Sequence, residues 1–129
     1  MDATLRRWPS VDSILDAMAD LPEYLGLNRP DVNTKGRFGN TPLKIAAVWG
    51  DVDAIELLVA AGARINERNE DGMTALHHAA AQNHPQAVKK LIALGASVDT
   101  RDDDGKTPLE LARILGNDDV IESLAKDGA

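Results

Sequence analysis

The chain repeats itself with a period of 33 residues, and this repetition limits its possible folds more than any other feature. Glycine stands at positions 39, 72 and 105, and threonine follows two residues later at 41, 74 and 107. The alignment continues with leucine at 43, 76 and 109 and with alanine at 46, 79 and 112. Repeating units of this length bury their apolar surface against their neighbours. We therefore expect a row of stacked units rather than one closed core.

Each unit has the pattern of two short helices. Thr41-Pro42 places a hydroxyl N-cap before a proline at the first helical position, where the missing N–H costs nothing. Glycine or asparagine, which tolerates the left-handed conformation at a helix end, stands at positions 50, 83 and 116. Ile55, Leu58 and Val59 have the spacing of one apolar helical face, so a second helix follows, and it should end at the glycines at 62, 95 and 128. Isolated helices shorter than ~12 residues are marginal in water, so stacking has to stabilise them.

The six residues at the start of each first helix are also a family signature. They read TPLKIA from Thr41, TALHHA from Thr74 and TPLELA from Thr107, and they resemble the T-P-L-H-x-A signature of the ankyrin repeat. The resemblance covers residues 31–129 and implies an all-α fold, an ankyrin-repeat solenoid of stacked helix-turn-helix units with short β-hairpin loops. RINERNEDG and SVDTRDDDG alternate and end in Asp-Gly, which favours such hairpins. We expect one domain over residues 1–129, with repeats at 38–70, 71–103 and 104–129.

The two end units differ from the others. Residues 9–37 are interpreted as a divergent N-terminal capping repeat, in which Val11 to Ala19 has helical apolar spacing and Pro22 can start a second short helix. Leu25 aligns with Leu58, and Asp31-Val32-Asn33 aligns with Arg64-Ile65-Asn66, which supports this interpretation. The last repeat is interpreted as a C-terminal cap, because Ser123 replaces an apolar residue and makes its outer face more polar.

Composition narrows the class of partner and the compartment. Fourteen basic and twenty-one acidic residues give a net charge of −7, so nucleic acid is an unfavourable partner and a basic protein a better one. The absence of cysteine excludes disulfides, thiolate zinc sites and a cysteine nucleophile. No apolar run approaches the ~20 residues of a membrane span, and the N-terminus lacks a secretory signal. The expected compartment is the cytoplasm, with no membrane and no cofactor involved.

Three histidines, His77, His78 and His84, lie close together in the sequence and raise the question of a metal or acid–base site. Adjacent helical residues point ~100° apart, so His77 and His78 cannot bind one metal ion together. The helical zinc motif has two conditions, which are histidines at i and i+4 and a glutamate. Neither condition is met, and His77 occupies the signature position that ties neighbouring ankyrin units together. We therefore expect no metal and no enzyme. A metal-binding or enzymatic protein that uses His77, His78 and Asp102 to Asp104 is the alternative from a different class.

The resemblance places partner contacts on the hairpin tips and on the concave face of the first helices. Trp49 and Phe38 are two of only four aromatic residues in the chain, so they are candidate hot spots. Two alternatives remain: Trp49 could cover the N-terminal cap, and Phe38 could pack on the neighbouring hairpin. The second and third tips are expected to form an acidic ridge that includes Asp102. The candidate partner-binding residues are Arg37, Phe38, Asn40, Val48, Trp49, Arg68, Glu70, Asp71, Met73, Gln82, Arg101, Asp103, Asp104, Lys106 and Leu115.

These observations favour a non-catalytic protein–protein binding module. Its small size suggests a monomer that acts as a stoichiometric binder or inhibitor of a protein target. One alternative is an immunity or antitoxin-type protein that neutralises a cationic toxin or enzyme. Another is a fragment of a longer protein, since a further repeat could follow Ala129.

Overall fold

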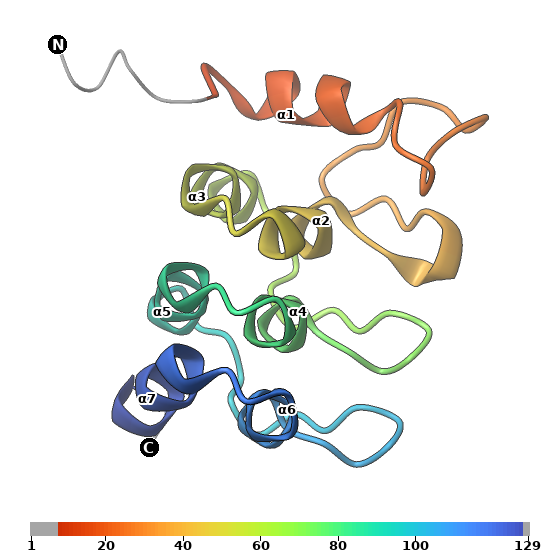
Figure 1. Cartoon of the computed structure of the whole chain (residues 1–129). Coiled ribbons are helices and arrows are strands. Elements are labelled where there is room, and N and C mark those ends of the chain that lie inside the picture. Colours follow the sequence, from red (N-terminus) through yellow and green to blue (C-terminus); the bar gives the residue numbers. More distant parts are fainter. Residues whose placement is uncertain (1–7, 128–129) are drawn as a thin grey trace, which may run out of the picture.

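The computed structural model describes residues 8–127 of the chain, and it is built from stacked pairs of helices (Figure 1). The helices α2, α4 and α6 pack side by side in one row, and α3, α5 and α7 form the second row. This arrangement confirms the expected all-α repeat fold. The elements are α1 (Val11–Met18), the 3-10 turn η2 (Arg37–Gly39), α2 (Pro42–Trp49), α3 (Val52–Ala60), α4 (Ala75–Ala81), α5 (Pro85–Ala93), α6 (Pro108–Leu115) and α7 (Asp118–Asp127).

The helix ends lie where the capping residues predict them. Each signature threonine accepts a hydrogen bond at its side-chain oxygen from the backbone N–H three residues later. The residues predicted to be left-handed are so, with φ of 70° at Gly50, 59° at Asn83 and 70° at Gly116. α3 and α5 end two residues before Gly62 and Gly95, as expected. Residues 1–7 and the expected helix end at Gly128 lie outside the described range.

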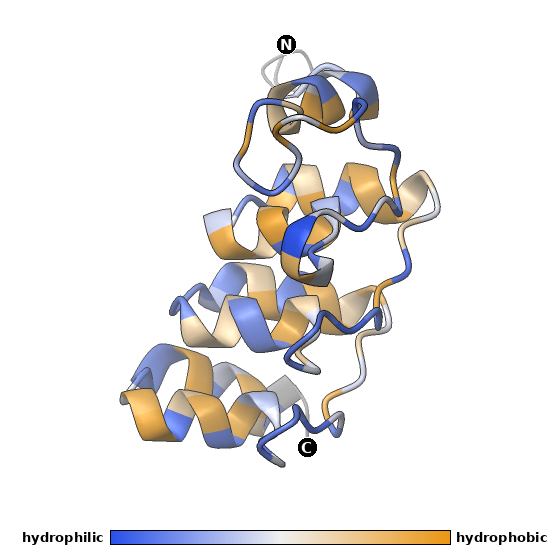
Figure 2. Cartoon of the chain, turned by 90° about the vertical axis from the view of Figure 1, so that its right-hand side faces the viewer, coloured by the Kyte–Doolittle hydropathy of each residue, from blue (hydrophilic) through white to orange (hydrophobic). Residues whose placement is uncertain are grey.

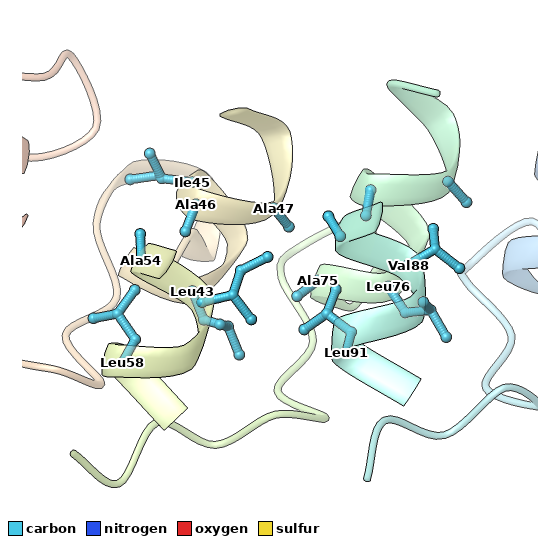
Figure 3. Close-up of a cluster of buried hydrophobic side chains, with 14 of the residues drawn as sticks. Leu43, Ile45, Ala46, Ala47, Ala54, Leu58, Ala75, Leu76, Val88 and Leu91 are labelled. Carbon is cyan, nitrogen blue, oxygen red and sulfur yellow. The ribbon is translucent and has the colours of Figure 1, made fainter. Parts of the chain in front are cut away.

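The core lies between successive repeats. Figure 3 shows Leu43 and Leu58 of one repeat together with Leu76 and Leu91 of the next, and each of these side chains is at most 1% exposed. Alanines between them, such as Ala46, have no exposed surface and let the helices approach closely. Burying one leucine stabilises a fold by about 1.5–3 kcal/mol, so most of the stability resides in these interfaces.

The loops between the repeats turn back on themselves but contain no β-strand within residues 8–127. The base of each tip is closed by a backbone hydrogen bond, for example from Asn69 N–H to Met73 O at 2.9 Å and from Asp102 N–H to Lys106 O at 2.9 Å. In residues 8–127 the expected short β-hairpin loops are therefore turns without paired strands. The residue after each closing pair is already the N-cap of a helix, so the chain leaves the hairpin before a second pair can form.

The N-terminal unit departs further from the expected repeat. α1 packs against α3 and lies across the end of the stack (Figure 1). The second helix expected at Pro22 is absent, because residues 18–27 form successive turns. Tyr24 fills the core there, fully buried, with its hydroxyl within hydrogen-bond distance of Thr34 O (2.9 Å) and Asn40 O (3.0 Å). Leu25 is 57% exposed, so its alignment with Leu58 does not predict its packing.

The C-terminal unit also differs from the expectation at one residue. Ser123 is buried and not part of a polar outer face. Its hydroxyl donates to Asp119 O at 3.0 Å, one helical turn earlier, so the polar atom is satisfied within α7.

One side chain at the start of each second helix reaches back to the preceding unit. The imidazole of His84 lies 2.9 Å from Val48 O through Nε2, and Asn117 Nδ2 donates to Ala80 O at 2.8 Å. Asp51, at the equivalent position, accepts a hydrogen bond from Trp8 Nε1 at 2.7 Å. The bonds of His84 and Asn117 satisfy carbonyl groups at the ends of the preceding helices, and all three bonds link neighbouring units.

Candidate partner-binding surface

The hairpin tips are joined into one continuous row. Glu70 N–H donates to Phe38 O at 3.1 Å, and Asp103 N–H donates to Asp71 O at 3.0 Å. Figure 2, which looks onto the tips, shows largely hydrophilic loops between α3 and α4 and between α5 and α6. The tips therefore form a single surface whose spacing is set by backbone bonds.

The arginines of the tips serve mainly to brace them. Arg68 donates through Nε to Gly72 O at 3.0 Å and through Nη2 to Arg101 O at 3.1 Å. Arg101 donates through Nη1 to Gly105 O at 2.8 Å and lies 3.3 Å from Glu110. Both guanidinium groups are thus occupied within the protein.

The acidic side chains of the tips divide into two kinds. Glu70, Asp71 and Asp104 are exposed, and their carboxylates have no hydrogen bond or ion pair within residues 8–127. Asp103 is also exposed and lies 3.6 Å from Arg68. Asp102 does not belong to the ridge as expected, because it is buried and accepts the N–H groups of Asp104 and Lys106 at 2.9 Å each.

The first tip carries an exposed aromatic side chain on a strained backbone. Phe38 is 66% exposed, so its side chain does not pack on the neighbouring hairpin, which was one of the two expectations. Its φ of 65° and ψ of 14° are left-handed, a conformation uncommon for a bulky residue, and Gly39 follows with φ of 72°. Arg37 beside it donates to Pro22 O at 2.7 Å.

Trp49 packs on the N-terminal unit and also stays partly exposed. The ring of Trp8 stacks on the ring of Trp49, with centroids 6.4 Å apart and planes inclined by 16°. Trp49 nevertheless keeps 36% of its surface exposed. It therefore covers the junction with the N-terminal unit and also presents an apolar surface to solvent.

The remaining predicted contact residues are not all accessible. Asn40 is 5% exposed, so its assignment as a contact residue is wrong. Its carbonyl accepts from Gly36 N–H at 2.8 Å, and its Oδ1 lies 3.3 Å from Asn69 Nδ2, which makes it a structural link between tips. Val48, Met73 and Lys106 are half-buried, whereas Gln82 and Leu115 are exposed, Leu115 beside the equally apolar Ile114.

A groove of about 440 Å³ lies between the N-terminal unit, the first tip and α2. Its lining is more apolar than polar, and the volume lies within the usual range for ligand pockets of about 300–1,000 Å³. The lining residues are Leu21, Pro22, Glu23, Arg37, Phe38, Lys44, Ile45, Val48 and Trp49. Both hot-spot candidates thus line one groove.

Lys44 is a residue of this groove that the sequence analysis did not select. It stands at the third position of its helix, where His77 and Glu110 stand in the next two repeats. His77 Nδ1 accepts the N–H of Thr74 at 3.1 Å, and Glu110 Oε1 accepts the N–H of Thr107 at 3.2 Å. An ammonium group cannot accept a hydrogen bond, so Lys44 cannot take this structural role. That chemical difference was visible in the sequence.

The three histidines have separate structural roles, and that of His84 is the contact of its Nε2 with Val48 O at 2.9 Å. His77 is fully buried and ties its repeat to the next one, since its Nε2 lies 2.9 Å from Lys106 O; burial lowers its pKa. Because Nδ1 accepts from Thr74, the proton is assigned to Nε2. His78 lies 3.3 Å from Asn69 Nδ2, and burial, followed by the charges of Lys44 and His77, lowers its pKa to about 4.

A metal site requires a cluster of ligating side chains, and a membrane span requires a long apolar helix. Residues 8–127 contain no group of three or more His, Asp or Glu side chains that could hold a metal ion. None of their helices has both the length and the apolar character needed to span a bilayer.

Comparison with known proteins is consistent with the repeat geometry. A family model described as ankyrin repeats (3 copies) matches residues 14–102 and again residues 61–129. No curated protein matches the chain.

Proposed function

Since the chain belongs to the ankyrin-repeat family, whose repeats form protein–protein interaction modules, we propose that it is a non-catalytic, monomeric, cytoplasmic binder of one protein partner with a basic face. By covering that face it acts as an inhibitor. The family is generally non-catalytic, and the tips and the adjoining groove are the surfaces best suited to the proposed contact.

The three exposed carboxylates of Glu70, Asp71 and Asp104 carry this proposal. They have no partner of their own within residues 8–127, while Arg68 and Arg101 are held by backbone carbonyls. An unpaired acidic row attracts a basic surface and speeds its encounter, less so at high salt. A standard interface buries ~800 Å² on each partner, which is about an eighth of the 6774 Å² accessible surface here.

Affinity capture from the organism that encodes the protein, followed by light scattering on the purified complex, tests the proposal. The charge variant combines Glu70→Gln, Asp71→Ser and Asp104→Ser. A matched control removes three exposed carboxylates away from the tips, through Asp31→Ser, Asp99→Ser and Glu122→Gln. We expect a one-to-one complex that the tip variant weakens at least about tenfold and the control variant leaves intact.

Two results would overturn the proposal. One is equal weakening by both variants, because the effect would then come from net charge alone. The other is a captured partner that binds with the same affinity at about 50 mM and about 500 mM salt, since attraction between exposed charges is screened over this range.

A further inference from the structure

We propose that the groove beside α2 binds an apolar side chain of the protein partner that has a carboxylate next to it, with the carboxylate pairing with Lys44. This inference rests on the proposed function and specifies one part of the contact. It assigns to the N-terminal end of the surface a charge preference opposite to that of the second and third tips.

The apolar part of the proposed occupant follows from the groove walls. Phe38 comes from a tip and Val48 and Trp49 from the end of α2, and all three are among the residues that line the space of about 440 Å³. Large, partly exposed aromatic residues concentrate binding energy in protein interfaces. The backbone of Phe38 holds its ring in the solvent-exposed position despite a left-handed φ of 65°, and strain of this kind is typical of functional positions.

The acidic part of the proposed occupant follows from Lys44. This side chain is half-buried and has no carboxylate within 4.0 Å in residues 8–127. Burial lowers its pKa, because the ammonium charge is incompletely solvated. A partner carboxylate would compensate for that burial, and the hydrogen bond would be charge-assisted.

The other charged groups of the groove define the preference further. Arg37 adds a second positive charge, although its guanidinium also donates to Pro22 O at 2.7 Å. Glu23 lines the same groove and opposes an acidic occupant. Its negative charge offsets part of the effect of burial on the pKa of Lys44, although the two side chains form no ion pair within 4.0 Å. Together, Lys44, Arg37 and Glu23 give the groove one net positive charge within mainly apolar walls.

Three small probes of nearly equal shape isolate this preference: indole-3-acetate, its neutral amide indole-3-acetamide, and the cation tryptamine. Each is titrated into the ¹⁵N-labelled full chain while the amide signals of Phe38 and Lys44 and the indole N–H of Trp49 are followed by NMR. Probes of this size bind with a dissociation constant on the order of 1 mM. We expect indole-3-acetate to bind at the groove about fivefold more tightly than the amide, and tryptamine to bind most weakly.

Substitutions of Lys44 and Glu23 then assign the preference to individual charges. Lys44→Met keeps a side chain of similar length but removes the positive charge, so the acid and the amide should bind equally. Lys44→Arg keeps the charge and should preserve the difference. Glu23→Gln should strengthen binding of the acid about two- to threefold. The unfolding midpoint of each variant is measured first, and the three probes on the unmodified chain test the inference even where a variant does not fold.

Equal binding of the acid and the amide to the unmodified chain would overturn the inference. Signal changes confined to regions outside the groove, or an acid preference that survives in Lys44→Met, would do the same. The triple tip variant at Glu70, Asp71 and Asp104 should retain the acid preference. Failure of the groove inference is therefore distinguishable from failure of the proposed basic partner, which depends on the tips.

Discussion

Replacing His78 with leucine should remove a large part of the pH dependence of stability between pH 8 and pH 5. Leucine is the residue that the last repeat carries at the equivalent position, Leu111, so the substitution suits the helix. His78 is uncharged in the folded protein because burial, and then the neighbouring charges of Lys44 and His77, lowers its pKa to about 4. Its ordinary value is 6.5.

The size and sign of the effect follow from these two pKa values. Between pH 6.5 and about pH 4 the unfolded chain binds a proton at His78 that the folded chain does not bind. Stability is therefore fully present above pH 6.5 and is lost as pH falls through this window. At 1.36 kcal/mol per pKa unit, the complete loss is about 3 kcal/mol, of which about 2 kcal/mol has occurred at pH 5. That is a substantial share of a typical stability of about 5–15 kcal/mol.

Urea unfolding followed by circular dichroism at pH 8, 7, 6 and 5 measures this difference. The unmodified chain should lose about 2 kcal/mol more than His78→Leu between pH 8 and pH 5. Burial also lowers the pKa of His77, but this residue is present in both proteins, so its contribution largely cancels in the comparison. A difference below about 0.5 kcal/mol would refute the reasoning, because His78 would then titrate alike in the folded and unfolded chains.

Three further predictions concern stability. In urea unfolding, Gly50→Ala should destabilise the fold by at least about 1 kcal/mol more than Gly116→Ala, although both glycines have a φ of 70°. The reason is that a Cβ added at Gly50 would lie 2.6 Å from the ring of His84, whereas a Cβ added at Gly116 would meet no atom within 4 Å. The difference should disappear in a His84→Ala background. Phe38→Gly should raise the free energy of unfolding by up to about 1 kcal/mol by relieving its left-handed strain, and also weaken partner binding; loss of stability would contradict the first part. Leu76→Ala should lower the free energy of unfolding by about 2–5 kcal/mol in the same assay, since Leu76 is completely buried between repeats; a loss below about 1 kcal/mol would contradict this packing.

The parts of the fold that the sequence predicts are those determined within one repeat. Thr74 caps its helix because a hydroxyl three residues before a backbone N–H can bind it without any distant partner. Asn83 adopts the left-handed conformation for a similarly local reason. The repeat makes the packing predictable as well, because Leu76 and the equivalent leucines of the other repeats have nearly the same neighbours.

Prediction is poorest where the repeat stops. The N-terminal unit has turns where a second helix was expected, and the ring of Tyr24 is buried in the core there. No other repeat has an equivalent residue from which this could be predicted. The stacking of Trp8 on Trp49 also joins residues 41 positions apart, outside the repeat register. For the same reason the accessibility of Phe38 and the burial of Asn40 were not evident from the aligned tips, although both residues lie in the same turn.

The repeat nevertheless offers an internal control for finding functional residues. At the third position of the first helices, His77 and Glu110 both return a hydrogen bond to their capping threonine, so stability explains these two residues. Lys44 cannot make that bond, and it places a positive charge where burial disfavours one. Lys44 does not make the hydrogen bond of the equivalent residues in the other repeats, and its charge is partly desolvated as well. Binding to a partner explains such a residue better than stability of the fold does. At Lys44 that reasoning leads to a partner carboxylate, and the binding ratio of indole-3-acetate to its amide measures it.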